Sequence, residues 1–337
     1  MHHSYLFILF LFFCIFSSCN EPENSESVAS SEIISSEFPI TFTFANYLGD
    51  SQNIHPKVLY FEEGWNGYKF WMAYTPYPYG EISAENPSIA VSNDGVTWSQ
   101  PGCFVNPLIG APIGGYNSDT HLVFNEAKNE LECWWREAYE AIKVDRIMRT
   151  TSKDGITWTI PEEVYTDGKS MMHLSPAISL IKGVYYMFYC NANDVVLMKS
   201  RGDSKPMEWS AEKILPIDWN GLHPWHLDVL LDENEMADII VCAFTKGNNN
   251  NSADLYYLNY DLVNDKYSEP QIILSRSTNP EDIHSRSLYR SSLLKINGCY
   301  YIYFSCIDNS WKRYMSLAFG EDIYHLKFHP LSQPLVF

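Results

Sequence analysis

Histidine and carboxylate residues stand at the starts of several apolar segments along the chain. In "GLHPWHLDVLLDENEMADIIVCAF", two histidines, a tryptophan and an aspartate precede a run typical of a buried strand. Similar runs begin at "NIHPKV", "NSDTHLVF" and "LYRSSLL". Strand starts that only pack against neighbours rarely carry such ionisable groups, because burying them is costly. The pattern therefore predicts a pocket built from distant segments.

Five of these segments can be aligned on their apolar cores. The alignment brings together at one position His55, Asp119, Leu174, His226 and Arg290. Two residues further on, and so on the same face of each strand, it places Lys57, His121, Pro176, Asp228 and Ser292. This convergence favours a functional pocket. The alternative is that these polar groups satisfy one another across a narrow channel.

Two further pairs of polar residues are expected at the same rim. Arg136 and Glu137 follow the aromatic run "ECWW", and Glu85 and Asn86 open "ENPSI". Each pair also has a structural interpretation, because Glu85 can serve as a turn carboxylate and Glu137 can form an ion pair with Arg136. The aromatic residues expected near the pocket are Trp65, Trp71, Tyr77, Tyr79, Trp225 and Tyr289.

An internal repeat covers about residues 38–337. Each unit runs from a polar cluster into an apolar strand, a turn, an aromatic-rich strand and a third strand. The turn pairs Asn66-Gly67, Lys182-Gly183 and Asn297-Gly298 are typical of hairpins, and no helical period of useful length appears. Units of about 50–65 residues with three or four antiparallel strands predict an all-β, five-bladed β-propeller. Either "FPITFTFANY" or "QPLVF" would supply the strand that closes the ring.

Two of the units contain the related turns "SNDGVTW" and "SKDGITW". They resemble the Asp-box of sialidases but lack the residue that the box has between Asp and Gly. We expect Asp94 and Asp154 to bond their own backbone, the following glycines to adopt positive φ, and Trp98 and Trp158 to pack between blades. These turns are therefore interpreted as structural.

The first 37 residues fall outside the repeat. An apolar run from Tyr5 to Phe16 ends at "FSSC", which resembles a bacterial lipoprotein signal. We expect residues 1–19 to form the signal peptide with Cys19 lipidated, and residues 20–37 to form a disordered tether. The acidic stretch after Cys19 resembles the surface-export signal of Bacteroidetes lipoproteins. This predicts a lipid-anchored protein of the outer membrane or cell surface; the alternative is ordinary cleavage, with a periplasmic or secreted product.

The amino-acid composition makes some classes of binding partner and cofactor improbable. The formal charge of −18 and the lack of a basic run argue against nucleic acid and weakly against a polyanionic substrate. Six cysteines follow Cys19, four of them in apolar runs, and none has the spacing of a zinc site. We therefore expect these cysteines to be free and to lie in the core. We also expect no resident cofactor and a monomer.

The residue types of the predicted pocket suit a carbohydrate. Aromatic faces stack on sugar rings, and two carboxylates that flank a glycosidic bond supply the acid and the base of hydrolysis. The candidate catalytic carboxylates are Asp119, Glu137, Asp228 and Glu85. The candidate substrate-binding residues are His55, Asn86, His121, Arg136, Trp225, His226, Tyr289 and Arg290.

The five-unit pattern resembles the five-bladed propeller glycoside hydrolases of family 43 and their relatives. It is closer to a bacterial group with the strings "HPxV", "ENPSI", "SDxHL", "WHxDV" and "YRSS", which stand here between His55 and Ser292. The resemblance implies glycan hydrolysis, with arabinan-like furanosides as one substrate class, and a channel cation such as calcium near His226. Family 43 places an Asp, an Asp and a Glu on its first three blades, and only Asp119 matches. The acid and base are therefore expected from Glu137 and Asp228, with Glu85 as the substitute.

Three classes of function remain open from the sequence. A cell-surface glycosidase is favoured, because four rim carboxylates exceed what binding of neutral sugars requires. A non-catalytic glycan-binding lipoprotein would use the same aromatic residues without an acid/base pair. A propeller glycoside phosphorylase would need several basic groups for phosphate, and the rim offers mainly Arg290, Arg136 and Lys57.

Overall fold

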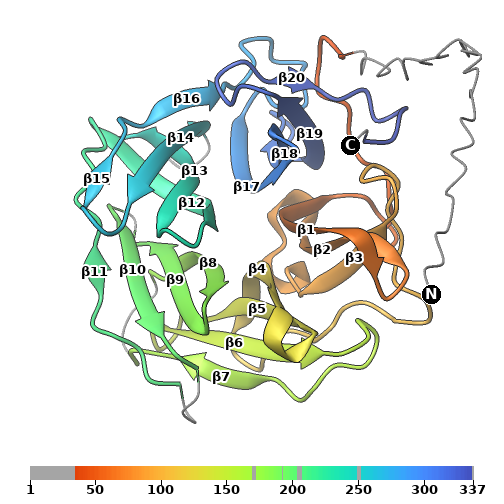
Figure 1. The fold of residues 1–337 in the computed structure, drawn as a ribbon. Helices are drawn as coiled ribbons and strands as arrows, with labels where there is room; N and C mark the ends of the chain where they lie inside the picture. Colours follow the sequence, from red (N-terminus) through yellow and green to blue (C-terminus); the bar gives the residue numbers. More distant parts are fainter. Residues whose placement is uncertain (1–34, 169–171, 192, 203–206, 249–251, 336–337) are drawn as a thin grey trace, which may run out of the picture. The chain divides into compact units, whose positions relative to one another are not determined.

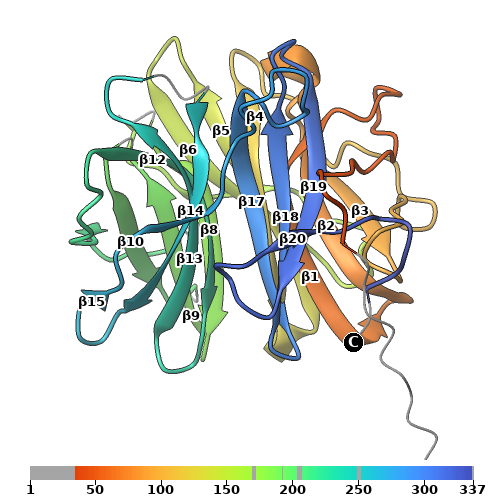
Figure 2. The same ribbon diagram turned by 90° about the horizontal axis from the view of Figure 1, so that it is seen from above.

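A computed structural model describes residues 35–168, 172–191, 193–202, 207–248 and 252–335. They form five small antiparallel sheets arranged around a common axis (Figure 1). The strands of every sheet run between the two faces of the ring, as the view turned by 90° shows (Figure 2). The predicted five-bladed β-propeller is confirmed.

Each sheet is one blade, and its strands follow one another along the chain. Blade 1 contains β1 (Asn53–Trp65), β2 (Tyr68–Pro76) and β3 (Ser88–Ser92). Blade 2 contains β4 (Tyr116–Asn125), β5 (Glu130–Tyr139), β6 (Val144–Ser152) and β7 (Glu162–Tyr165). Blade 3 contains β8 (Leu174–Ile181), β9 (Val184–Cys190), β10 (Val195–Ser200) and β11 (Lys213–Ile214).

The last two blades follow the same plan. Blade 4 contains β12 (Leu222–Leu231), β13 (Met236–Thr245), β14 (Asp254–Asp261), β15 (Lys266–Tyr267) and β16 (Gln271–Leu274). Blade 5 contains β17 (Ser287–Ile296), β18 (Cys299–Ile307), β19 (Arg313–Gly320) and β20 (Lys327–Phe328). Three short 3-10 turns complete the elements: η1 (Pro78–Gly80), η2 (Ile82–Ala84) and η3 (Glu126–Lys128).

The first strand of each blade lines the axis. Contacts link β1 to β4, β4 to β8, β8 to β12, β12 to β17 and β17 back to β1. In all five blades a register shift near the start of this inner strand interrupts its pairing with the second strand. Such β-bulges bend a strand and redirect the side chains next to them. The bulges therefore turn the polar residues of the strand starts towards the axis.

Apolar clusters fill the spaces between neighbouring blades. The clusters join blades 1 and 2, 2 and 3, 3 and 4, 4 and 5, and 5 and 1. Trp65 and Trp71, which were expected near the pocket, belong instead to the cluster between blades 1 and 2. All four cysteines from the apolar runs are buried, and the six described cysteines are free, as predicted.

The turns follow the chemistry of their residues. Asn66, Lys182 and Asn297 have φ of 46°, 49° and 50°, and each is followed by a glycine with φ near 80°. Asp94 Oδ1 accepts hydrogen bonds from the backbone N–H of Val96 (2.9 Å) and Thr97 (2.7 Å). Asp154 does the same in blade 2, and both tryptophans pack into clusters between blades. The structural interpretation of these two turns is confirmed.

Both terminal segments take part in closing the ring, and neither forms a regular outer strand there. The Phe42 N–H donates to Met315 O of blade 5 (2.9 Å), whereas the Leu335 N–H donates to Asp94 O of blade 1 (2.9 Å). Phe42 and Leu335 then pack in the cluster between blades 5 and 1. Closure therefore rests on these two backbone hydrogen bonds and on side-chain packing between the first and last blades.

The predicted signal peptide, Cys19 and residues 20–34 of the tether lie outside the described residues. The Ser36 N–H donates to Phe328 O (2.9 Å), so a residue just before the predicted boundary at 38 already contacts blade 5. Among the described residues, no helix has the length and apolarity needed to cross a membrane.

Candidate active site

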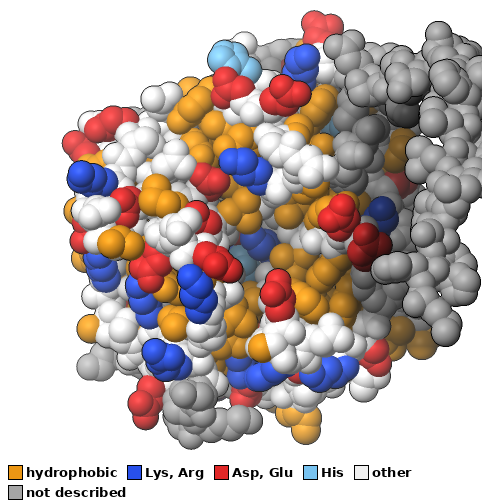
Figure 3. Space-filling view, viewed as in Figure 1, with side chains coloured by type: hydrophobic (Ala, Val, Ile, Leu, Met, Phe, Trp, Pro, Cys, Tyr) orange, Lys and Arg blue, Asp and Glu red, His pale blue; other side chains and the backbone are white. Residues whose placement is uncertain are grey.

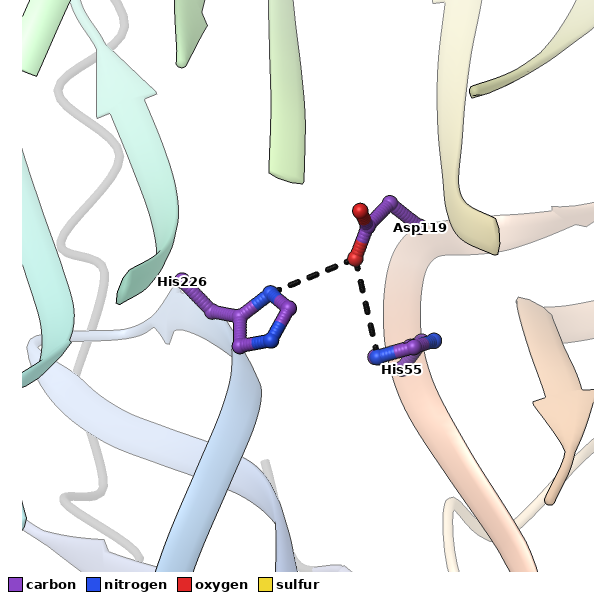
Figure 4. A group of neighbouring side chains, drawn as sticks. All are labelled: His55, Asp119 and His226. Carbon is purple, nitrogen blue, oxygen red and sulfur yellow. Dashed lines mark ion pairs between the residues drawn. The ribbon is translucent and has the colours of Figure 1, made fainter. Parts of the chain in front are cut away.

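Three inner strands bring His55, Asp119 and His226 together near the axis (Figure 4). Asp119 Oδ1 lies 3.2 Å from His226 Nδ1 and 3.6 Å from His55 Nε2. All three side chains are buried. Their candidate donor atoms lie within 4.8 Å of one another. The predicted convergence of blades 1, 2 and 4 is therefore present.

The backbone at this site is left-handed at three positions that are not glycine. His55 and Asp119 both have φ of 55°, and Ser175 of blade 3 has φ of 54°. This conformation is uncommon for residues with a Cβ, and such strain concentrates at functional sites. The strand pairing makes Ser175 the blade-3 equivalent of His55, and it makes Tyr289 the blade-5 equivalent. The alignment on apolar cores, which gave Leu174 and Arg290, was wrong by one residue at both places.

Each histidine of the cluster is oriented by a hydroxyl group. His55 Nδ1 is hydrogen-bonded to Thr75 Oγ1 (2.9 Å), and His226 Nδ1 to Ser175 Oγ (2.7 Å). The buried atoms His55 Nε2, His226 Nε2 and Asp119 Oδ1 find no hydrogen-bond partner among the described residues. Burial lowers the pKa of both histidines, which favours the neutral ring that binds metals.

Asp119 is held ionised by its neighbours. Its Oδ2 accepts from Arg136 Nε at 3.2 Å, and Arg136 Nη1 also contacts Asp145 at 3.2 Å. Burial acts to raise the pKa of Asp119, but His226, His55 and Arg136 together bring it well below its usual range. Two carboxylates raise the pKa of Arg136 despite its burial. The site thus contains a carboxylate that stays charged near neutral pH.

Glu85 lies on the other side of His55 and is in the opposite protonation state. Its Oε2 accepts from Ser118 Oγ (2.8 Å) and lies 3.5 Å from His55 Nδ1. Burial and the charge of Asp119 raise the pKa of Glu85 to about 8. A protonated and an ionised carboxyl group therefore flank one imidazole ring, which is how a protein supplies an acid and a base together.

A second layer of charged residues lies one step further along the inner strands. Lys57 Nζ contacts both oxygens of Asp228, at 2.8 and 2.9 Å, across the axis between blades 1 and 4. Asp228 Oδ2 also accepts from the Leu293 N–H (2.8 Å). Arg290 Nη2 lies 3.2 Å from His121 Nδ1, whose ring contacts Ile178 O through Nε2 at 2.9 Å. In this layer Lys57 and Asp228 pair across the channel, whereas Arg290 Nε and Nη1 have no hydrogen-bond partner among the described residues.

The remaining predicted site residues divide between the pocket and the frame around it. Tyr289 stacks on His55 and lies against His226, with ring centroids 5.4 and 4.3 Å apart, and Trp225 contacts His226 edge-on. The Asn86 side chain donates a hydrogen bond to the Tyr47 hydroxyl and accepts one from Asn117 Nδ2, both at 2.9 Å. It therefore braces the rim.

Glu137 lies on the opposite face of β5 from Arg136. Neighbouring residues of a strand point to opposite sides, and Arg136 points to Asp119. The hydrogen-bond partner of Glu137 is the Tyr139 hydroxyl (2.9 Å), two residues along the same face. The structure therefore separates Glu137 from the cluster around Asp119.

The donor set suits a divalent metal ion. Two neutral imidazoles and one carboxylate leave coordination positions open for water and substrate, as in catalytic metal sites. Asp119 Oδ1 lies 3.6 Å from His55 Nε2 and 3.2 Å from His226 Nδ1, and the first two of these atoms have no hydrogen-bond partner among the described residues. The Thr75 hydroxyl fixes the His55 ring at its other nitrogen, as metal ligands require, whereas His226 Nδ1 also bonds the Ser175 hydroxyl. The residues present therefore fit a metal, although the sequence predicted only a channel cation near His226 and no ligand spacing.

A space-filling view of the face seen in Figure 1 shows acidic and basic side chains interspersed with hydrophobic surface (Figure 3). Sequence analysis predicted Tyr77 near the pocket but overlooked four residues around the site: Thr75, Tyr116, Asp145 and Arg313. Thr75 and Tyr77 stand at the end of the second strand "WMAYTPY", where the partners of the bulged strand were to be expected.

Similar proteins act on carbohydrates. No family model matches the chain. A curated deacetylase of Flavonifractor plautii, an A type blood N-acetyl-alpha-D-galactosamine deacetylase, is 28% identical over 255 residues, which is 61% of this chain. The chain spans about a third of that protein's length (33%).

Solved structures agree on the fold. The N-acetylgalactosamine deacetylase from F. plautii, in complex with blood group B trisaccharide, has a TM-score of 0.71 at 20% identity over 85% of this chain and 94% of its own. The family 43 glycoside hydrolase XynB of Bacillus licheniformis has 0.59 at 13% identity, covering 89% of this chain and 57% of its own. A Bacteroides ovatus family 43 protein of a xyloglucan locus has 0.61 at 15% identity, covering 83% and 53%. The chain thus has the propeller fold of carbohydrate-active enzymes, in agreement with the resemblance to family 43 relatives.

Proposed function

We propose that the protein is a metal-dependent carbohydrate deacetylase that hydrolyses the acetamido group of an N-acetylated sugar. The observation that carries this proposal is the buried cluster of His55, Asp119 and His226, whose candidate donor atoms lie within 4.8 Å of one another. Support comes from the similarity to an N-acetylgalactosamine deacetylase. The predicted glycosidase pair of Glu137 and Asp228 lacks comparable support, because both residues are engaged away from this cluster.

The residues of the site can be assigned roles in this reaction. A divalent ion held by His55, Asp119 and His226 would polarise the amide carbonyl and activate a water molecule. Glu85, which is protonated because its pKa is raised to about 8, can donate its proton to the departing amine and regain one from the attacking water, so that amide and water become acetate and amine. Arg136 keeps Asp119 ionised and in place, whereas Tyr289 and Trp225 offer aromatic surface to the sugar.

The deciding experiment measures two products in one reaction. The purified protein is incubated with N-acetylated oligosaccharides, including the blood group A trisaccharide, and with arabinan and xylan. Acetate and new reducing ends are quantified after chelation and after adding back Zn²⁺, Mn²⁺ or Co²⁺. We expect metal-dependent acetate release without shortening of the glycan.

Matched carboxylate variants identify the residues involved. Asp119→Asn and Glu85→Gln should each lower acetate release by at least about 100-fold, the usual scale for lost acid–base or electrostatic catalysis. Glu137→Gln is the control, because this carboxylate lies on the other face of β5, and it should keep activity within about twofold. Equal loss in all three variants would contradict the assignment.

A glycosidase remains the second candidate, because Glu85 and Asp119 form a protonated and an ionised pair in one pocket. Reducing ends without acetate, unchanged by chelation, would establish it. Binding of a glycan without either product would instead favour a non-catalytic lipoprotein.

We also propose, on the sequence of the first 37 residues alone, that Cys19 is lipidated and anchors the protein at the cell envelope. Radiolabelled palmitate should be incorporated into the full chain but not into Cys19→Ser. Equal labelling of the two proteins would refute the anchor.

A further inference from the structure

Two arginines stand together at the rim of the candidate active site, on blade 5. Arg286 directly precedes β17, and Arg313 begins β19. Both ends belong to the site face, because Ser287 pairs with Ile307 and the turn 308–312 joins β18 to β19. This is the end of the inner strands that also holds His55 and Asp119.

A tryptophan holds the two guanidinium groups in place. The Trp311 ring lies 3.7 Å from the Arg286 guanidinium carbon and 5.5 Å from that of Arg313, measured to the ring centroid. Trp311 is 38% exposed and has φ of 68°, a left-handed conformation that is strained for a residue with a Cβ. Such strain persists only where the surroundings enforce it.

Neither arginine is paired with an acid. Among the described residues, no carboxylate comes within salt-bridge distance of either guanidinium, although the chain carries a formal charge of −18. The acid of the connecting turn, Asp308, is already committed: its Oδ1 accepts from Ser310 and Lys312 N–H groups, and its Oδ2 from the Tyr314 hydroxyl.

Burial makes the unpaired charge of Arg313 costly, and Arg286 is half-buried beside it. Arg313 is only 4% exposed, and the buried Nε atoms of both arginines have no hydrogen-bond partner among the described residues. Each arginine also repels the other, since like charges lie across one indole ring. A bound anion would satisfy the unused donors of both groups, because a planar guanidinium binds carboxylate, sulfate or phosphate with paired hydrogen bonds.

This rim is connected to the candidate active site. Gln52 Oε1 accepts from the N–H groups of both Tyr79 and Arg313 (3.2 Å each), so it ties the η1 turn of blade 1 to blade 5. The Arg313 guanidinium lies over the Tyr77 ring at 4.8 Å. Tyr77 in turn neighbours Glu85, whose charge contributes to raising the Tyr77 pKa.

We propose that Arg286 and Arg313, held by Trp311, form a subsite for an anionic group on the glycan, so that the protein prefers acidic or acid-substituted sugars. The net charge of −18 argued weakly against anionic ligands, whereas the two arginines create a positively charged site at this rim. The inference rests on the proposed function only in taking a glycan as the ligand.

Binding measurements test it without relying on catalysis. Affinities of glucuronic acid, N-acetylglucosamine 6-sulfate and glucose 6-phosphate are compared with those of glucose and N-acetylglucosamine, by calorimetry or ligand-observed NMR at low salt. At least one anionic sugar should bind about tenfold or more tightly than its neutral counterpart, the scale of a charge-assisted hydrogen bond. The sugar that does so identifies the anion as carboxylate, sulfate or phosphate.

Arg286→Gln should abolish this preference and leave neutral-sugar binding unchanged. The control is Arg201→Gln, the same change at an exposed arginine of blade 3, which should keep the preference. If Arg286→Gln does not fold, competition on the unmodified protein decides, since inorganic sulfate must displace the anionic sugar. Equal affinity for neutral and anionic sugars, or an unchanged preference in Arg286→Gln, would overturn the subsite. Failure of acetate release alone would overturn only the deacetylase.

Discussion

Replacing Lys57 with methionine tests whether the second layer of the channel is structural. The change removes the ammonium group that contacts both oxygens of Asp228 at 2.8 and 2.9 Å, and it keeps the aliphatic stem. Asp228 is 1% exposed and would keep the Leu293 N–H as a hydrogen-bond donor. A buried carboxylate that loses its counter-charge destabilises a protein by about 3–5 kcal/mol.

The size of the effect can be measured by urea unfolding. With an m-value of about 3 kcal/mol per M, a loss of about 3–5 kcal/mol lowers the midpoint by about 1–1.7 M urea. The double variant Lys57→Met/Asp228→Asn removes both charges and keeps an acceptor for the Leu293 N–H. It should recover most of the lost free energy of unfolding, giving a coupling energy of about 2–3 kcal/mol between the two positions.

The same variants decide the role of Asp228. If Lys57→Met lies within about 1 kcal/mol of the wild type, the reasoning about a closed ion pair is refuted. If Asp228→Asn folds with wild-type stability and loses turnover, Asp228 is catalytic, as the sequence predicted, and the proposed separation of the two layers fails.

Two further predictions concern stability. Gly155→Ala should destabilise the fold by at least about 3 kcal/mol, because its Cβ would lie 2.0 Å from the Trp71 ring; Gly67→Ala, with positive φ but no atom within 4 Å, should cost only about 1 kcal/mol in the same urea assay. Burial lowers the pKa of His329 from about 6.5 to about 4, so the neutral ring is the form that the fold favours. Its contribution is therefore complete above pH 6.5 and is lost as the pH falls towards 4. His329→Asn should flatten the pH dependence of unfolding free energy in that window by about 2–3 kcal/mol, and an unchanged slope would contradict the burial argument.

The architecture was accessible from sequence because it depends on local signals that repeat. The Asn-Gly turns, the alternation of apolar residues and the Asp94 and Asp154 turns each specify a hairpin or a connection without distant information. Repetition of these signals five times leaves little freedom in fold class. The residues that gather at the axis could be named for the same reason, since the inner strand of each unit starts with them.

The assignment of roles within the site failed where it depended on geometry across strands. A bulge adds one residue to one strand, so alignment on apolar cores misplaced the blade-3 and blade-5 positions and hid Ser175 as the partner of His226. Side chains alternate between the two faces of a strand, so the adjacent residues Arg136 and Glu137 could not both have belonged to the site. This rule could have excluded one of them from the sequence alone. Nothing local, by contrast, indicates that Lys57 and Asp228 meet, since 171 residues separate them.

The two layers of polar residues along the channel differ in how completely their hydrogen bonds are made. Near the mouth, the cluster of His55, Asp119 and His226 leaves donor atoms unsatisfied, which is unstable unless a ligand completes it. One step further along the inner strands, Lys57 pairs with both oxygens of Asp228, which also accepts from the Leu293 N–H. The separation predicts opposite responses to mutation, with stability lost in the deeper layer and ligand binding lost in the upper one.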